Sequence, residues 1–205
     1  MKITRCRNKL TNIPIIILNN GETIKDIELS LFSNFFVMGI NDSFFNYPNC
    51  DMLLLDNKKI IKENYNVISG LRCIKYCPGV NDTKLNNLEI NILKNTESNL
   101  KYNYRRQIYD NKCIQDLAVQ LSVFLGCSPI ITAGFDSKNK RKNKKERSTI
   151  SNRCEKCMVS HSKNLKNVIF SMTPNDHIPY VDPFGVHSKY NDCCPDRLDL
   201  LKRLF

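Results

Sequence analysis

The hydrophobic pattern is most regular in residues 111–136, whose sequence is NKCIQDLAVQLSVFLGCSPIITAGFD. The first half carries apolar residues at helical spacing on one face: Ile114, Leu117, Ala118, Leu121 and Phe124. Gly126 and Pro129 predict the end of this helix, because glycine adopts the left-handed stop and proline cannot continue a helix. The run Ile130–Ala133 has no polar alternation, which is typical of a strand buried on both faces. A buried helix followed by such a strand indicates a parallel α/β sheet.

Short apolar runs between polar turns predict the other strands. These runs are residues 13–18, 35–40, 52–55, 67–76, 88–93 and 168–170. The predicted helices are residues 24–31 with Thr23 as N-cap, 58–64, and 197–204 with Asp196 as cap. Residues 96–110 and 174–197 are predicted to be irregular. Because strands alternate with helices, we expect one α/β domain over residues 1–205, with helices on both faces of a mainly parallel sheet and strand 13–18 next to 35–40 and 130–134.

The composition is that of a globular protein, with 41% hydrophobic and 25% charged residues. The first apolar run, residues 13–18, is too short to cross a bilayer, contains a proline and lacks a small-residue cleavage site. These features predict a cytoplasmic protein without a membrane span. Ten cysteines in such a chain of 205 residues are predicted to be free thiols rather than a disulfide framework.

The net charge of +11 is concentrated in one segment. Residues 138–166 hold eleven Lys and Arg against two acids, which predicts a basic insertion within a nearly neutral domain. Three interpretations remain open for it: a solvated loop, a contact for nucleic acid through counterion release, or a lid whose cations neutralise a nucleotide's phosphates. The insertion contains no aromatic residue to stack on bases, which weakens sequence-specific RNA binding.

Three predicted strands end in similar polar turns, which are Asn19-Asn20-Gly21, Asn41-Asp42 and Asp56-Asn57. At the carboxyl edge of a parallel sheet, asparagine amides can bind ribose hydroxyls, a base edge or phosphate oxygens. Gly21, next to a predicted helix start, would let a phosphate approach free backbone N–H groups. The alternative is that these are ordinary turn residues. The GxGxxG fingerprint and the P-loop are absent from the sequence, which argues against ordinary NAD binding and P-loop ATPase chemistry.

Three segments, about half of the chain, carry a characteristic order of elements. PIIILNNGETIKDIELSLFSNFFVMGINDSFFNYPNCDMLLLDN gives a strand, a short helix, a strand ending in Asn, an aromatic segment and a third strand. NKCIQDLAVQLSVFLGCSPIITAGFD gives a helix, a Leu-Gly turn and a strand ending in Asp, and VIFSMTPNDHIPYVDP gives a strand and a Thr-Pro turn. In this order the chain resembles a family of three-layer Rossmann-like proteins. One branch includes archaeal hydroxymethyl-dihydropterin pyrophosphokinases, and a related branch includes bacterial sialyltransferases that use CMP-sialic acid.

The resemblance implies a transferase that acts on a nucleotide-activated donor. Glycosyl transfer is the favoured reaction, and pyrophosphoryl transfer is the alternative. It places Asn20, Gly21 and Asn41 on the nucleotide, with Asp56 or Asn57 from the third strand. Asp136 would contact the nucleotide from the later strand, assist catalysis, or hold Mg²⁺ together with Asp56 in the second reaction. The chain departs from the family at Glu22-Thr23, where the family has Pro-Ser. An acid at this position near a phosphate would require a compensating cation. The rival hypothesis is a non-catalytic binding or structural protein, of viral type, that engages nucleic acid through residues 138–166.

The histidines and paired cysteines supply the remaining candidate chemistry. His177, shortly after a predicted strand end, is a candidate general base for an acceptor hydroxyl, and a backbone-bonded loop histidine is the alternative. Cys154 and Cys157 have the spacing of two zinc ligands. Three further residues would complete that site: His161, Cys193 and Cys194.

Overall fold

The computed structural model describes residues 3–77, 92–94, 108–110, 113–135, 159–161, 163–165, 168–173 and 175–204. Its centre is a six-stranded, all-parallel sheet in the order β4-β3-β2-β1-β7-β8. The strands are β1 (Ile15–Leu18), β2 (Phe36–Ile40), β3 (Met52–Leu54), β4 (Ile74–Tyr76), β7 (Ile130–Ala133) and β8 (Ile169–Ser171). The predicted parallel sheet is confirmed, and β1 lies between β2 and β7 as expected.

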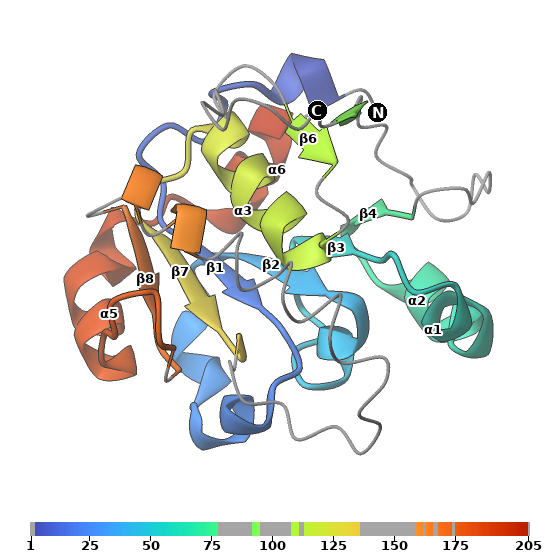
Figure 1. Ribbon diagram of the computed structural model, residues 1–205, viewed down its shortest axis with the longest axis horizontal. Helices are drawn as coiled ribbons and strands as arrows, with labels where there is room; N and C mark the ends of the chain where they lie inside the picture. The colour runs from blue at the N-terminus through green and yellow to red at the C-terminus, as the bar shows by residue number, and fades with distance from the viewer. Residues whose placement is uncertain are drawn as a thin grey trace.

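Helical segments cover both faces of this sheet. One face packs against η1 (Ile3–Cys6), α3 (Ile114–Leu125) and α6 (Arg197–Leu204). The other face packs against η2 (Glu22–Asp26), η3 (Leu29–Phe32), η4 (Asn41–Phe45), α1 (Lys58–Glu63), α2 (Tyr65–Gly70) and α5 (Pro183–Tyr190). Figure 1 shows α5 at the β8 end of the sheet and α1 and α2 at the β4 end. The arrangement is the three-layer Rossmann-like fold that the sequence predicts.

The strands are apolar throughout because both of their faces are buried. In β1, Ile15 and Ile17 enter the core beneath α3, whereas Ile16 and Leu18 enter the core on the opposite face. Burial of all four side chains explains why this strand shows no polar alternation in sequence.

The predicted helix and strand of residues 114–133 are both present. α3 ends at Gly126, which has a φ of 90° in the left-handed region, and β7 begins at Ile130. Backbone N–H groups of Asn8, Leu10 and Asn12 donate to the last carbonyls of the helix and to that of Gly126. The N-terminal segment therefore caps the end of α3, which the helix alone would leave unsatisfied.

Three predicted elements are wrong in detail. Residues 67–76 are not one strand, because α2 occupies the first part and only β4 is extended. Residues 24–31 form no α-helix: η2 starts at Glu22 with Gly21 as N-cap, and Ile24 and Ile27 bury side chains three positions apart, which suits a 3₁₀ turn. Residues 174–197 are not irregular, because α5 lies within them.

A second, two-stranded parallel sheet pairs β5 (Ile92–Lys94) with β6 (Ile108–Asp110). The strand predicted at 88–93 thus overlaps β5, but it pairs outside the main sheet. The prediction that residues 96–110 are irregular is wrong for residues 108–110.

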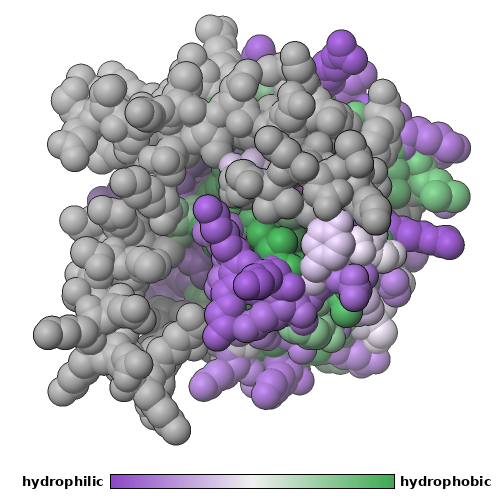
Figure 2. Space-filling view, turned by 90° about the vertical axis from the view of Figure 1, so that its right-hand side faces the viewer, coloured by the Kyte–Doolittle hydropathy of each residue, from purple (hydrophilic) through white to green (hydrophobic). Residues whose placement is uncertain are grey.

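Among the described residues, no helix is long and apolar enough to cross a membrane. Figure 2 faces the side that carries α1 and α2, where hydrophilic side chains (purple) surround a smaller area of hydrophobic ones (green).

Candidate functional site

The order in which the chain adds strands to the sheet reverses direction between β1 and β7. From β1 the chain proceeds through β2 and β3 to β4 on one side, and β7 and β8 lie on the other side. The backbone N–H of Asn19 donates to the carbonyl of Ala133 at 2.9 Å, so the two strands remain paired up to their carboxyl ends. In open parallel sheets this switch point is where ligands bind. Asn19, Asn20 and Gly21 follow β1 at this switch point, and Asn41, Asp56 and Asn57 follow the next two strands along the same edge.

Gly134 brings the ends of β1 and β7 into close contact. Its φ is 72°, in the left-handed region, and a Cβ on it would lie 2.2 Å from the carbonyl oxygen of Asn19 and 3.0 Å from the amide nitrogen of Gly21. Gly21 itself has an ordinary extended conformation, with φ −72° and ψ 160°, and it is buried. The glycine that conformation requires at this switch point is therefore Gly134, because the φ and ψ of Gly21 suit any residue.

Asn20 joins the loops after β1 and β2. Its Nδ2 donates to Oδ2 of Asp42 at 2.9 Å, and its Oδ1 accepts from Nδ2 of Asn46 at 2.6 Å. These partners are 22 and 26 residues away in sequence. The side chain thus holds one strand-end loop against the next. This is a structural role, and the predicted contact with a nucleotide would be a second role for the same side chain.

Asn41 joins the ends of β2 and β3. Its Oδ1 accepts from the backbone N–H groups of Asp56 at 3.1 Å and Asn57 at 3.4 Å. Its φ is 48°, a left-handed conformation that asparagine tolerates better than most residues. No described residue accepts a hydrogen bond from its Nδ2, and the side chain is half-buried. A strained residue at the switch edge with an unused amide donor is the arrangement expected of a ligand contact.

The other predicted contacts on this side differ in what they do. Asn57 is the N-cap of α1, and its Oδ1 accepts from the backbone N–H groups of Lys59 and Ile60. Asp56 is exposed. Asn19 is half-buried, and its side chain has no hydrogen bond to another described residue. The structure thus gives Asn57 an established local role and leaves Asn19 and Asp56 accessible at the edge.

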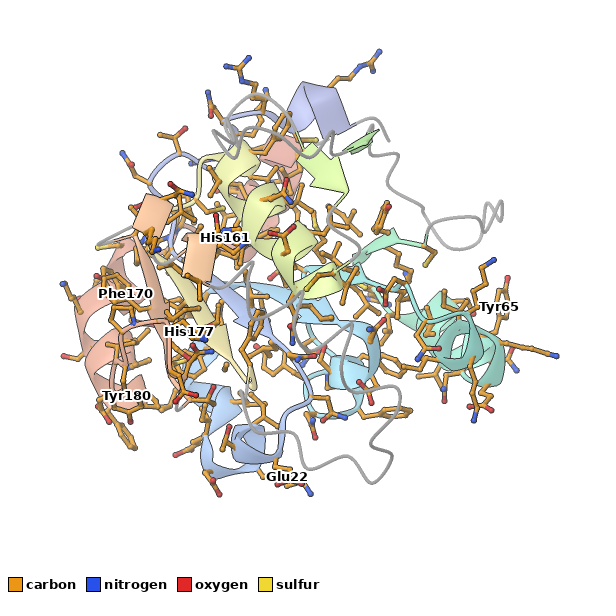
Figure 3. All side chains as sticks on the ribbon, viewed as in Figure 1. Glu22, Tyr65, His161, Phe170, His177 and Tyr180 are labelled. Carbon is orange, nitrogen blue, oxygen red and sulfur yellow. The ribbon has the colours of Figure 1, made fainter. Side chains whose placement is uncertain are left out.

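His177 lies in the loop that follows β8, at the same edge of the sheet but on the other side of the switch point. Nδ2 of Asn175 donates to the carbonyl of Phe135 at 3.0 Å, which fastens this loop to the end of β7. Oδ1 of Asn175 accepts from the backbone N–H of His177 at 2.9 Å. Figure 3 shows His177 beside the ends of β7 and β8, with Glu22 at the bottom of the molecule. The candidate base is therefore held at the edge and half-buried.

His161 occupies a different environment, beneath α3. Its Nε2 lies 2.7 Å from Oδ1 of Asp116, and both side chains are almost completely buried, at 0% and 1% exposure. Gln120 donates from Nε2 to the other oxygen of Asp116. The sequence suggested His161 as a completing zinc ligand, and the structure instead pairs it with a carboxylate from the first turn of the helix. The signal missed in the sequence is Asp116, the one charged residue of α3.

Several predicted residues lie outside the described part of the chain. They are Asp136, Cys154, Cys157 and most of the basic insertion, so those predictions stand as made. Among the described residues, no three His, Cys, Asp or Glu side chains come together as a metal site. Cys193 is exposed and Cys194 half-buried, and the eight described cysteines form no disulfide with one another. The predicted zinc and magnesium sites both include residues outside the described ranges, so both stay predictions.

Phe45 is an edge residue to which the sequence assigned no function. It ends η4 directly after β2, and 59% of its surface is exposed. The aromatic run of residues 44–48 marked the loop, but only the structure shows which ring is outside.

The chain was compared with known proteins. It matches no protein-family model and no curated protein sequence. A solved structure that it resembles is the sialyltransferase CstII from Campylobacter jejuni in complex with the substrate analogue CMP-3FNeuAc. The identity is 17%, the match covers 90% of this chain and 87% of that chain, and the TM-score is 0.49. Function is therefore argued from the residues at the carboxyl edge.

Proposed function

We propose that this protein is a transferase that binds a nucleotide-activated sugar at the carboxyl edge of its sheet and transfers the glycosyl group. The observation that carries the proposal is the Asn41 side chain. Its Oδ1 is used to hold the ends of β2 and β3 together, and its Nδ2 remains a donor at the edge next to the switch point. An amide held in this way can recognise a ribose hydroxyl or a base oxygen without losing conformational freedom on binding.

The edge divides naturally between a donor part and an acceptor part. Adjacent strands lie about 4.8 Å apart, so the end of β2 and the loop after β8 are separated by three spacings, roughly 14 Å. The nucleotide occupies the ends of β1, β2 and β3, and contacts Asn19, Asn20 and Asn41. His177 or Asp136, on the β7 and β8 side, removes the proton from the acceptor hydroxyl.

The charges at the edge bear on where the phosphate lies. Glu22, Asp42 and Asp56 are all at the β1–β3 side and would repel a phosphate placed among them. The basic insertion follows Asp136 and is therefore close to β7 in sequence, so we expect its cations to approach the phosphate from the β7 side. In this arrangement the leaving nucleotide phosphate faces the insertion, and the base and ribose face the asparagines.

Glycosyl transfer is preferred over pyrophosphoryl transfer because of the metal requirement. Pyrophosphoryl transfer would use Mg²⁺ bound by Asp56 and Asp136. The segment that follows Asp136 supplies cations in place of further acids, because residues 138–166 hold eleven Lys and Arg against two acids. Leaving-group stabilisation by lysines and arginines needs no metal.

Calorimetry with CMP, CDP, UDP, ATP and GTP, with and without magnesium, tests the proposal. The wild-type chain is expected to bind at least one of these nucleotides. Asn41→Asp keeps both acceptor bonds to the β3 end but replaces the free donor by a charged oxygen, and should weaken binding at least tenfold. Asn66→Asp is the matched control, because it makes the same change on exposed α2, away from the edge.

Two results would count against this function. One is the absence of binding by the wild-type chain at millimolar concentrations of all five nucleotides. The other is equal loss of affinity in Asn41→Asp and Asn66→Asp, which would mean that added negative charge, not the edge donor, controls binding.

A further inference from the structure

We propose that Phe45 is the residue on which the base of the bound nucleotide stacks. This inference rests on the nucleotide site proposed above and specifies how that site recognises its ligand. Phe45 lies in η4, the segment that begins with Asn41 and is followed by Asn46. It is therefore part of the same loop that carries two of the edge amides, and its ring is largely in water.

The ring is held firmly although it is exposed. Its centroid lies 4.3 Å from that of Phe44, which is buried at 2% exposure. Beneath it, Oγ of buried Ser43 accepts from the backbone N–H of Ile40, and the carbonyl of Ser43 accepts from the N–H groups of Asn46 and Tyr47. On the other side, Nδ2 of Asn46 donates to Asn20. A ring fixed by its neighbours presents a flat apolar surface at little cost in conformational entropy.

The position of Phe45 distinguishes it from other exposed apolar residues. Single exposed apolar side chains are common and need no explanation. Five large ones occur among the described residues: Phe45, Val67, Tyr180, Phe184 and Leu198. Phe45 alone among these five lies in sequence between Asp42 and Asn46, the two residues to which the side chain of Asn20 is hydrogen-bonded. An aromatic face beside amide donors and acceptors matches a nucleobase, which has a π-face and a polar edge.

Stacking makes a specific demand on the ligand. A nucleotide gains from the ring through its base, whereas ribose 5-phosphate has no base to stack. Phe45→Ala should therefore weaken those nucleotides that the wild-type chain binds by about ten- to a hundredfold, the range seen when stacked aromatics are removed. The same substitution should leave the affinity for ribose 5-phosphate unchanged within about twofold.

Phe184 supplies the matched control. It is also a phenylalanine, 63% exposed, but it lies near the start of α5. Phe184→Ala should leave the affinity for every ligand unchanged. Because both rings are on the surface, neither alanine variant should fail to fold.

A fluorescence measurement gives an independent readout, because the chain contains no tryptophan. In Phe45→Trp the introduced indole becomes the sole tryptophan and can still stack. Its emission should be quenched by the bound nucleotide and unaffected by ribose 5-phosphate. In Phe184→Trp neither ligand should change the emission.

The outcomes separate this inference from the function on which it rests. If Phe45→Ala binds nucleotides as tightly as the wild type while Asn41→Asp does not, the nucleotide site stands and the stacking role is refuted. Equal weakening of nucleotides and ribose 5-phosphate by Phe45→Ala would also refute it, because the ring would then act on the loop and not on the base. If the wild-type chain binds no nucleotide, both proposals fall.

Discussion

The α-carbon of Gly134 packs directly against the backbone of Asn19, so that a Cβ on Gly134 would lie 2.2 Å from the Asn19 carbonyl oxygen. This contact joins β1 and β7, the two adjacent strands between which the strand order reverses direction. Real Cβ atoms do not approach a carbonyl oxygen so closely. The atoms that a Cβ would meet belong to the backbone, so no flexible side chain could move aside to make room for it. The geometry of the candidate site thus depends on a glycine outside the strand-end asparagines that the sequence emphasised.

Gly134→Ala is expected to lower the free energy of unfolding by roughly 2–5 kcal/mol, from left-handed strain and from overpacking. Gly70→Ala is the control. Gly70 ends α2, and a Cβ there meets nothing within 4 Å, so this variant should be as stable as wild type or slightly more so. Urea denaturation of the three proteins measures the difference. Equal stability of both variants would show that the ends of β1 and β7 are not packed as described.

The stability of Asn41 variants should follow an unusual order. Asn41→Asp retains the acceptor for the N–H groups of Asp56 and Asn57 and should be close to wild type. Asn41→Gly accepts the φ of 48° but loses the acceptor, at a cost of about 1 kcal/mol. Asn41→Ala loses the acceptor and is also strained, at about 1–3 kcal/mol. An alanine variant more stable than the glycine variant would contradict the left-handed conformation.

The buried pair of Asp116 and His161 should be strongly coupled. Removal of either partner by alanine leaves a polar group buried without its companion and is expected to cost about 3–5 kcal/mol. The double variant should cost less than the sum of the two, with a coupling energy of about 1–3 kcal/mol. The exposed pair Asp199 and Lys202, at 3.0 Å, is the control and should show less than about 1 kcal/mol. Additive losses at the buried pair would mean that the two side chains do not interact.

Much of the fold could be predicted because its signals are local. α3 and β7 carry their own periodicity, and the stop at Gly126 is written in adjacent residues. The predicted strand 67–76 overlaps the end of α2, where the adjacent β-branched residues Val67 and Ile68 favour an extended chain, yet only Ile68 is buried. A local signal was overlooked at α5, where Asp182 caps the helix by accepting from Gly185 and Pro183 occupies its first turn.

The candidate site could be predicted only in outline. The strand-end turns identify the edge, since all parallel strands present their carboxyl ends on one side. The bonds that Asn20 makes to Asp42 and Asn46 depend on how two loops fold over the edge, and no pattern in the sequence specifies them. The same limit applies to Phe44 and Phe45, because two adjacent identical residues give no sequence signal of which one is buried.

The buried cysteines should make the protein less stable in alkali. Burial raises the pKa of the Cys77 thiol to about 11 from an ordinary 9.0, and it raises the pKa of Cys127 still further. Above about pH 9 the unfolded chain releases these protons while the folded chain keeps them, so the free energy of unfolding is highest below pH 9 and falls as the pH rises. Each such thiol contributes a slope of up to about 1.4 kcal/mol per pH unit.

Cys127→Ala should remove one thiol's share of this slope, whereas Val119→Ala, which shortens a buried side chain of α3 that does not titrate, should leave the slope unchanged. Urea denaturation of both variants and the wild type between pH 8 and about pH 10.5 measures the slopes. Comparison of slopes, not of absolute stabilities, separates the titration of Cys127 from the packing lost when its side chain is shortened. The same slope in all three proteins would show that Cys127 ionises in the folded chain as readily as in the unfolded chain, and hence that its environment is not the dry core between α3 and β7.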